Sequence, residues 1–330
     1  MPPRFDLDFE ARHGELVDVS PLLRRIVCDN PSKFTFHGTG TYVIGRGEVA
    51  VVDPGPRDPV HVERLLAALA GERIREILVT HTHGDHSPAA RALADATGAP
   101  ILGFGPHPAA ATDEGDETLG DDDWDTGEER KEPTDEEAAR AREDHEKHRP
   151  DTDFVPDRRL AHGDVVEGPG WTVEALHTPG HISNHLCFAL AEEKAVLSGD
   201  HVMGWSTTII PPPDGDLRAY LDSLQLLLTR DDEVLYPTHG GPVRDPAAHV
   251  KALHDHRLLR TQQIVQQLEA GPRSVREIVE VLYASVAREL WRPAARSVIA
   301  HLVALGDEGR ARPVIESSSP MATSTTWELT

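Results

Sequence analysis

The chain has 330 residues, 38% of them apolar, and it carries 56 Asp and Glu against 33 Lys and Arg, which gives a net charge of −23 at pH 7. This length suits one large domain, or one domain with a small module. No stretch reaches the roughly 18 apolar residues of a membrane-spanning helix, and the N-terminus lacks the apolar core of a secretory signal. With only two cysteines, Cys28 and Cys187, the composition predicts a protein of the reducing cytoplasm without a membrane span.

The negative charge is concentrated in one segment. Residues 113–153 hold 19 Asp and Glu against 6 Lys and Arg, which is more than half of the net charge of the chain. Few large apolar side chains occur between 105 and 154, so we expect an acidic, solvated insertion there, with a charged helix at 136–148. An acidic body repels nucleic-acid backbones unless a local basic patch outweighs it.

Strand and helix patterns alternate through the first hundred residues. The expected strands are 41–44, 48–52, 77–79 and 101–103, and the expected helices are 60–69 and 87–97. Gly45-Arg46-Gly47 separates the first two strands, which predicts a hairpin. We expect Ser87 to be the N-cap of the second helix, with Pro88 at its first position and Gly98 just after its end.

After the insertion, strand patterns come first and helical patterns later. The expected strands are 171–176, 186–190, 195–197 and 234–236, and the expected helices are 217–228, 252–268, 274–282 and 293–305. Ser274 and Glu277 have the spacing of a capping box. Three helices followed by a short hairpin at 310–315 predict a winged helix-turn-helix module. We therefore divide the chain into a large α/β domain at 1–246, a winged-helix domain at 247–316 and a flexible tail at 317–330.

Candidate metal ligands are concentrated in the segment from Thr80 to His86. Its sequence places His81, His83, Asp85 and His86 within six residues, directly after the apolar strand at 77–79. Imidazole and carboxylate groups are the preferred ligands of zinc and similar divalent ions. This cluster therefore predicts half of a two-metal site.

Three more strand ends each carry one candidate ligand. His181, Asp200 and His239 follow the expected strands at 171–176, 195–197 and 234–236, and each has a neighbouring glycine that allows a tight turn. Loops at one edge of a sandwich can converge on a single site. Together with the first cluster, these residues make seven ligands, which suits two ions of four or five ligands each that share a bridging carboxylate.

The four segments resemble, in order, the motifs of the metallo-β-lactamase superfamily. They are Thr80 to His86, Thr178-Pro179-Gly180-His181, Ser198-Gly199-Asp200 and Pro237-Thr238-His239-Gly240, and Asp53 in Val51-Val52-Asp53-Pro54-Gly55 matches the first motif. The resemblance implies an α/β fold, namely an αββα sandwich. It also extends to Gly38–Tyr42 and Gly199–Trp205, which resemble a lactamase-like branch with a C-terminal winged helix and endoribonuclease-like relatives.

The resemblance also implies a division of the ligands between two zinc ions. One ion would be held by His81, His83 and His181, the other by Asp85, His86 and His239, and Asp200 would bridge them. Asp53 would orient the ligand loop without binding a metal itself. The resemblance covers residues 15–104 and 155–315, and the acidic segment has no counterpart in it.

The chemistry expected of such a centre is metal-assisted hydrolysis. Two zinc ions, or manganese or iron, lower the pKa of a bound water, provide a hydroxide nucleophile and stabilise the charge that develops on the scissile oxygen. Asp85 is the candidate residue for orienting the nucleophile or accepting its proton. His185 and His201 follow ligands closely in sequence and are candidates for proton donation or for hydrogen bonds to the ligands.

Three functions remain open on the sequence. The first is cleavage of phosphodiesters in single-stranded RNA, which rests on the resemblance and the winged helix, although residues 251–312 hold only 10 Lys and Arg against 7 Asp and Glu. The second is hydrolysis of a small ester, thioester or lactone, as in glyoxalase-like relatives, which an acidic surface tolerates more readily.

The third function is DNA-binding regulation through the winged helix. Arg288, Arg292 and Arg296 could line a recognition helix, whereas Val298 and Leu302 have the spacing of a buried packing face. The winged helix could therefore serve as a packing module.

Overall fold

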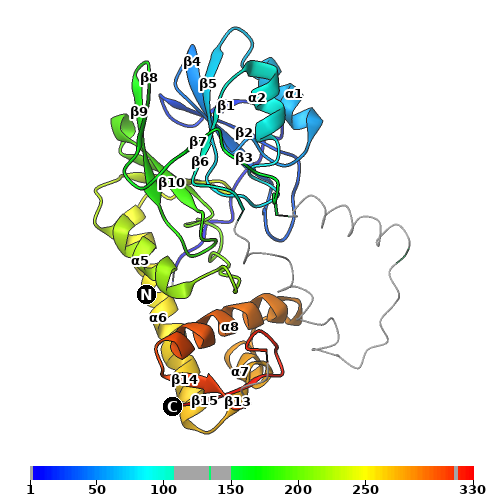
Figure 1. The fold of residues 1–330 in the computed structure, drawn as a ribbon, viewed down its shortest axis with the longest axis vertical. Helices are drawn as coiled ribbons and strands as arrows, with labels where there is room; N and C mark the ends of the chain where they lie inside the picture. The colour runs from blue at the N-terminus through cyan, green and yellow to red at the C-terminus, as the bar shows by residue number, and fades with distance from the viewer. Residues whose placement is uncertain (1–2, 108–133, 135–149, 316–318) are drawn as a thin grey trace.

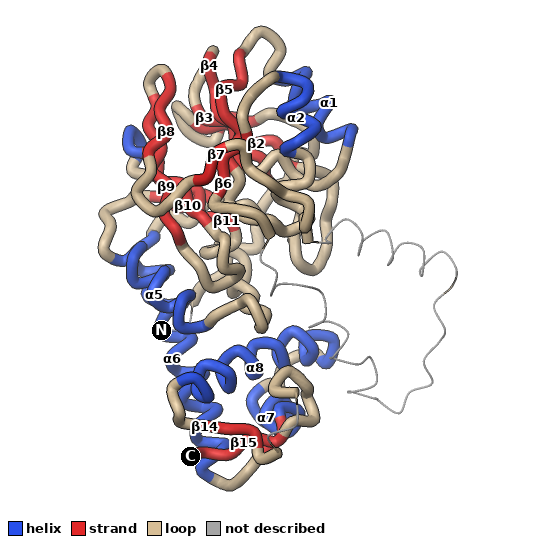
Figure 2. Tube along the Cα trace, in the orientation of Figure 1, coloured by secondary structure: helices blue, strands red, loops and turns tan. Residues whose placement is uncertain are grey.

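The computed structural model describes residues 3–107, 134, 150–315 and 319–330 (Figure 1). Two β-sheets pack face to face with helices on both outer faces, and a smaller helical part with its own short sheet follows at the C-terminal end. Figure 2 shows α1 and α2 over one sheet and α5 over the other. The predicted αββα sandwich with a winged-helix domain is confirmed.

A seven-stranded sheet forms the first layer. Its strands lie in chain order: β1 (Val17–Asp18), β2 (Leu23–Val27), β3 (Gly40–Ile44), β4 (Glu48–Val52), β5 (Arg73–Leu78), β6 (Ile101–Gly103) and β7 (Arg158–Arg159). Strands β1 to β4 are antiparallel and include the predicted hairpin, in which Tyr42 pairs with Val52. Strands β4 to β7 are parallel, as helices α1 (Pro59–Ala68) and α2 (Ala90–Thr97) connect β4 to β5 and β5 to β6.

A five-stranded sheet forms the second layer. Its order is β12 (Val234–Pro237), β11 (Ala195–Gly199), β10 (Leu186–Leu190), β9 (Trp171–His177) and β8 (Val165–Gly168). Only the β11–β12 pair is parallel, and helix α5 (Leu217–Leu228) makes that crossover. Helix α5 begins and ends where the apolar spacing predicts, and Asp216 caps its first turn by accepting from two backbone amides.

Successive side chains of a strand point to opposite faces of its sheet, so the core is divided into layers. In β4, Ala50 and Val52 face the second sheet, where they meet residues such as Phe188. Val49 and Val51 face the opposite way, toward α1 and α2. The outer face of the second sheet packs on α5 and on the first half of α6 (Pro246–Glu269).

The C-terminal part has a separate core. It contains α7 (Val275–Leu282), α8 (Trp291–Asp307) and a sheet of order β13 (Arg273–Ser274), β15 (Thr326–Leu329) and β14 (Ala311–Pro313). The predicted capping box of Ser274 and Glu277 opens α7. Helix α6 runs through both parts, so the boundary predicted at 246 coincides with the start of a helix that two cores share (Figure 1).

The predicted flexible tail at 317–330 is wrong over its last residues. Residues 326–329 form β15, the central strand of the small sheet, and Trp327 is 2% exposed. A four-residue strand after a Ser- and Thr-rich stretch has too little local pattern to reveal pairing with strands far away in sequence.

Two details near the insertion also differ from the prediction. Helix α2 begins at Ala90 without a side-chain cap, because the hydroxyl of Ser87 donates to Asp151 instead (2.8 Å). Phe154, placed inside the predicted insertion of 105–154, is buried against the first sheet, so the described end of that segment belongs to the fold. The helix predicted at 136–148 lies outside the described residues. Within the described chain, no helix is long and apolar enough to cross a bilayer.

Candidate metal centre

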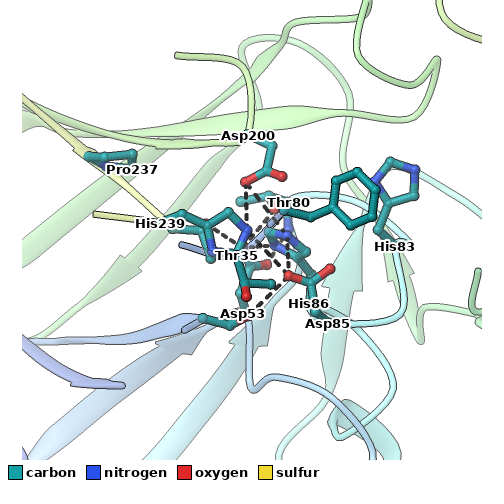
Figure 3. Close-up of polar contacts among 12 residues, drawn as sticks. Thr35, Asp53, Thr80, His83, Asp85, His86, Asp200, Pro237 and His239 are labelled. Atoms are coloured by element: carbon teal, nitrogen blue, oxygen red, sulfur yellow. Dashed lines mark hydrogen bonds and ion pairs between the residues drawn. The ribbon is translucent and has the colours of Figure 1, made fainter. Parts of the chain in front are cut away.

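The seven predicted ligands lie together at one edge of the sandwich. His81, His83, Asp85 and His86 follow β5, and the other three follow β9, β11 and β12. Figure 3 shows Asp85, His86, Asp200 and His239 pointing toward one another. The chain order of the strands therefore brings together residues that lie far apart in sequence.

Three imidazoles form one half of the cluster. Nδ1 of His83 lies 3.0 Å from Nε2 of His81 and 2.9 Å from Nε2 of His181. These ligand atoms belong to one group of potential metal donors. Nitrogen atoms that converge in this way, without a carboxylate among the three residues, suit a divalent ion better than a set of mutual hydrogen bonds.

The other half combines imidazoles with carboxylates. Oδ2 of Asp85 lies 3.2 Å from Nε2 of His239 and 3.4 Å from Nε2 of His86. Asp200 lies between the halves: its Oδ1 is 3.3 Å from Nε2 of His239, and its Oδ2 is 3.8 Å from Nε2 of His181. A carboxylate with one oxygen toward each half is placed to bridge two ions.

The ring nitrogens that face away from the centre are fixed by the protein. Nδ1 of His181 contacts the carbonyl oxygen of Ile209 (2.6 Å), Nδ1 of His239 contacts that of Gly38 (3.2 Å), and Nδ1 of His81 contacts the hydroxyl of Thr80 (3.0 Å). A ring that donates from Nδ1 presents a lone pair at Nε2, which is the usual arrangement around protein-bound metals.

Two buried atoms support the fit to divalent ions. Nε2 of His86 and Oδ1 of Asp200 are 3.6 Å apart, and neither has a hydrogen-bond partner among the described residues. Buried polar atoms are rarely left unpaired. Two ions bound by this donor set would satisfy both atoms, and the residues therefore fit the pair of metals that the sequence predicts.

Asp53 connects the ligand loop after β5 to the ligand loop after β12. Its Oδ1 accepts from the amide of Thr80 (2.8 Å), and its Oδ2 accepts from the Thr80 hydroxyl (2.7 Å) and lies 2.9 Å from Nδ1 of His86. Thr238, next to His239, donates to the same Oδ2 at 3.2 Å. Asp53 has a left-handed backbone (φ 50°) and is 1% exposed. It thus holds two ligand-bearing loops.

The electrostatic environment differs between the two halves. Burial and neighbouring imidazoles hold the pKa of His81 and of His83 well below the ordinary value. Burial also lowers the pKa of His239, but the carboxylates of Asp200 and Asp85 outweigh it and raise that pKa to about 10. The acidic half therefore attracts positive charge, and an ion that binds there must displace a proton.

Of the two roles predicted for His185, its position fits a hydrogen bond to a ligand residue and does not fit proton donation to a leaving group. It is fully buried, its Nε2 accepts from the backbone amide of Asp200 (3.2 Å), and its Nδ1 lies 2.9 Å from the hydroxyl of Thr178. Both ring nitrogens are thus used inside the protein. A side chain at Gly199 would meet this ring at 2.6 Å, and its φ of 52° also favours glycine. The structure gives His185 the geometry of a residue that orients Asp200.

His201 also lies away from the centre. It is fully buried and packs edge-on against the ring of Tyr220, with ring centroids 4.9 Å apart. Burial lowers its pKa to about 3, so it stays neutral at physiological pH. It is therefore unsuited to donate a proton to a leaving group.

Sequence reasoning missed three contacts to the ligands. The hydroxyl of Thr39 donates to Oδ2 of Asp85 (3.0 Å), the hydroxyl of Thr208 donates to the carbonyl oxygen of Asp200 (2.8 Å), and Ile209 holds His181. Thr39 lies in the Gly-Thr-Gly segment that the resemblance highlights. No pattern marks Thr208 and Ile209, since the hydroxyl of Thr208 contacts backbone carbonyl oxygens and Ile209 acts through its own backbone carbonyl.

Family models match most of this architecture. The model described as Metallo-beta-lactamase superfamily matches residues 35–239, and the model described as Beta-lactamase associated winged helix domain matches residues 274–317. The first match contains all seven residues of the cluster.

Similar curated proteins and solved structures cover nearly the whole chain. An atrochrysone carboxyl ACP thioesterase of Aspergillus chevalieri is 27% identical over 84% of this chain and 78% of its own. A beta-lactamase-like protein 2 homolog of Drosophila melanogaster is 29% identical over 89% of this chain and 90% of its own.

Among solved structures, a beta-lactamase domain protein from Burkholderia ambifaria has a TM-score of 0.72 at 18% identity. The match covers 99% of this chain and 97% of that protein. A metallo-beta-lactamase family protein from Thermus thermophilus has a TM-score of 0.66 at 24% identity, with 95% and 100% covered.

Proposed function

The chain belongs to the metallo-beta-lactamase superfamily and is a hydrolase, and from this premise we propose that it cleaves a small acyl thioester at a centre of two zinc ions. The convergence of seven imidazole and carboxylate ligands carries the proposal for the chemistry. The thioester as substrate is supported by the similarity to a relative named a thioesterase over most of both chains.

The ligands divide between the two ions as the resemblance implies. His81, His83 and His181 would hold one ion. Asp85, His86 and His239 would hold the other, and Asp200 would bridge both. Two bound divalent ions supply an activated water and an electrophile for the carbonyl oxygen.

Asp85 is the candidate residue for handling the nucleophile. Oδ2 of Asp85 faces the rings of His86 and His239 and accepts from Thr39, which fixes the plane of the carboxylate. The carboxylate can therefore orient the attacking water and accept its proton. His185 accepts from the amide of Asp200 and contacts Thr178, so it positions Asp200 and donates no proton to the leaving group.

The alternatives receive less support. Cleavage of single-stranded RNA needs a track of positive charge, whereas the chain carries a net charge of −23. DNA-binding regulation would use α8 as the recognition helix, but Ala300 of α8 packs into the same core as Leu217 and Tyr220 of α5. Other residues of α8, such as Val298, pack in the winged-helix core, so the helix is covered on two sides and has less free surface for a DNA groove.

A substrate panel tests the proposal. Protein loaded with two equivalents of zinc is incubated with an acyl-CoA thioester, a lactone, a bis-phosphodiester and labelled single-stranded RNA. We expect release of thiol from the thioester, its loss with a chelator and its recovery when zinc returns. Asp200→Ala should reduce the rate at least about 100-fold and lower the bound metal, while Asp222→Ala on the exposed face of α5 should change neither. Cutting of RNA alone would overturn the proposed substrate, and absence of bound metal in protein prepared without chelators would overturn the centre.

A further inference from the structure

A single cation interrupts the buried stripe of α6. Val250 and Leu253 pack against the second sheet, and Ile264 and Leu268 pack in the winged-helix core. Arg257 lies on the same stripe, between the two pairs, and is only 5% exposed. Helical spacing predicts an apolar residue here. Burying a guanidinium costs free energy unless its N–H groups form hydrogen bonds. The contacts of Arg257 therefore indicate why a cation occupies this position.

Arg257 contacts three different elements. Its Nη2 donates to the carbonyl oxygen of Thr208, its Nη1 lies 3.4 Å from the hydroxyl of Ser297 on α8, and the guanidinium carbon lies 5.4 Å from the ring centre of Tyr220 on α5. The contacts of the guanidinium with described residues are a backbone carbonyl, a hydroxyl and an aromatic ring. Its strongest partner is thus a backbone carbonyl in the loop after Asp200.

That loop orients two of the metal-site residues. The hydroxyl of Thr208 donates to the carbonyl oxygens of Asp200 (2.8 Å) and His201 (2.9 Å). The next carbonyl, that of Ile209, contacts Nδ1 of His181 at 2.6 Å. The dipeptide Thr208-Ile209 therefore fixes both the bridging carboxylate and one imidazole, and Arg257 holds the dipeptide from outside.

We propose that Arg257 is a positioning residue through which the winged-helix domain braces the metal centre. Nη2 of Arg257 holds the 208–209 loop, and through it Asp200 and His181. Nη1 connects the same guanidinium to Ser297 of the winged-helix domain. The winged-helix domain thereby helps to fix the geometry of the metal centre, and this role requires no nucleic acid. The inference rests on the proposed metal centre but not on the identity of the substrate.

Arg257→Met tests the proposal most directly. Methionine keeps an unbranched apolar stem but lacks the guanidinium. Removing a buried charge offsets part of the cost of leaving the Thr208 carbonyl oxygen without its donor. We expect a thermal midpoint within a few degrees of wild type, a metal affinity at least 10-fold weaker for one of the two ions, and an altered visible spectrum of the cobalt-loaded protein. The rate constant for hydrolysis at saturating substrate should fall, while KM changes little. Metal affinity is measured by competition with a chromogenic chelator.

Three further variants separate positioning from packing. Arg257→Lys keeps one donor and should recover part of the affinity and spectrum. Thr208→Val removes the hydroxyl that reaches Asp200 and should weaken metal binding in the same direction, with little further loss in the double variant. Thr261→Val removes another contact between α6 and α8, the 2.8 Å contact with Nδ1 of His301, and should leave metal binding unchanged.

The outcomes distinguish this inference from the proposed function. Wild-type protein that binds no metal contradicts the metal centre itself. Wild-type protein with two ions, together with Arg257→Met protein of unchanged affinity and spectrum, overturns the bracing role. If Arg257→Met does not fold, wild-type metal affinity and spectrum in both Arg257→Lys and Thr208→Val overturn the role equally.

Discussion

At the scale of single residues, Asp53 is a buried carboxylate that makes four polar side-chain contacts without being one of the proposed ligands. It accepts from Thr80 twice, from Thr238, and from Nδ1 of His86. Asp53→Asn preserves the size but replaces one acceptor with a donor, which then opposes the groups that donate to it. Since such outer contacts contribute about 10–100-fold to metal affinity, we expect a loss of that size for the ion at His86, measured by competition with a chelator.

Asp58→Asn is the matched control for this substitution. Asp58 is the N-cap of α1 and accepts from the amide of Val60, a role that asparagine also performs. The control should bind metal as wild type does. Equal metal binding by both variants would show that Asp53 supports the loop without tuning the ligand.

A site residue can be predicted from the sequence when its neighbours in the sequence already indicate its role. His81, His83, Asp85 and His86 are adjacent, so their shared chemistry stands out without any knowledge of the fold. His185 has a similar position in sequence but faces away from the site, because its two nitrogens bind the amide of Asp200 and the hydroxyl of Thr178. Orientation of this kind depends on packing between strands, which sequence spacing does not contain.

At the scale of elements, β15 makes the C-terminal residues part of the winged-helix core. Trp327 packs in this core, where its indole ring lies beside Gly306 of α8. Trp327→Ala should cost about 3–5 kcal/mol in the free energy of unfolding. We expect a lower thermal midpoint for the winged-helix domain, measured by calorimetry.

The neighbouring residue on β15 provides the control. Glu328 faces the other side of the strand and makes a 2.9 Å ion pair with Arg312, which is 65% exposed. Glu328→Gln should cost less than about 1 kcal/mol. Similar losses in both variants would contradict the assignment of β15, because a frayed tail has no inner and outer face.

At the scale of the whole molecule, the order of layers follows from chain order and alternation. Strands with apolar residues on both faces, such as β4, must be covered on both sides, and the helical patterns on either side of each sheet supply the cover. The packing of α8 against α5 through Ala300 could not be predicted from chain order and alternation. The apolar spacing of a helix does not reveal which element its small residues pack against. The two helices are also far apart in sequence.

Buried neutral histidines make the stability of the whole fold sensitive to acid. His61 on α1 is 3% exposed, and its Nε2 lies 2.9 Å from the hydroxyl of Thr41. Burial, the main cause, lowers the pKa of His61 to about 4, whereas histidine in an unfolded chain titrates near about 6.5. Between these two values the unfolded state binds more protons than the folded state. The stabilisation is therefore complete above about pH 6.5 and is lost as the pH falls toward 4, by about 3 kcal/mol for this residue.

His61→Gln tests this prediction, because glutamine keeps a donor for Thr41 but does not titrate in this range. The free energy of unfolding of wild type, from urea titrations at a fixed zinc concentration, should fall more steeply between pH 6.5 and 4 than that of the variant. His162→Gln, at an exposed position, should follow the wild-type curve, which controls for the general loss of metal in acid. If the His61→Gln curve ran parallel to wild type throughout, then His61 would be taking up a proton inside the folded protein, and acid sensitivity would have to come from the metal centre alone.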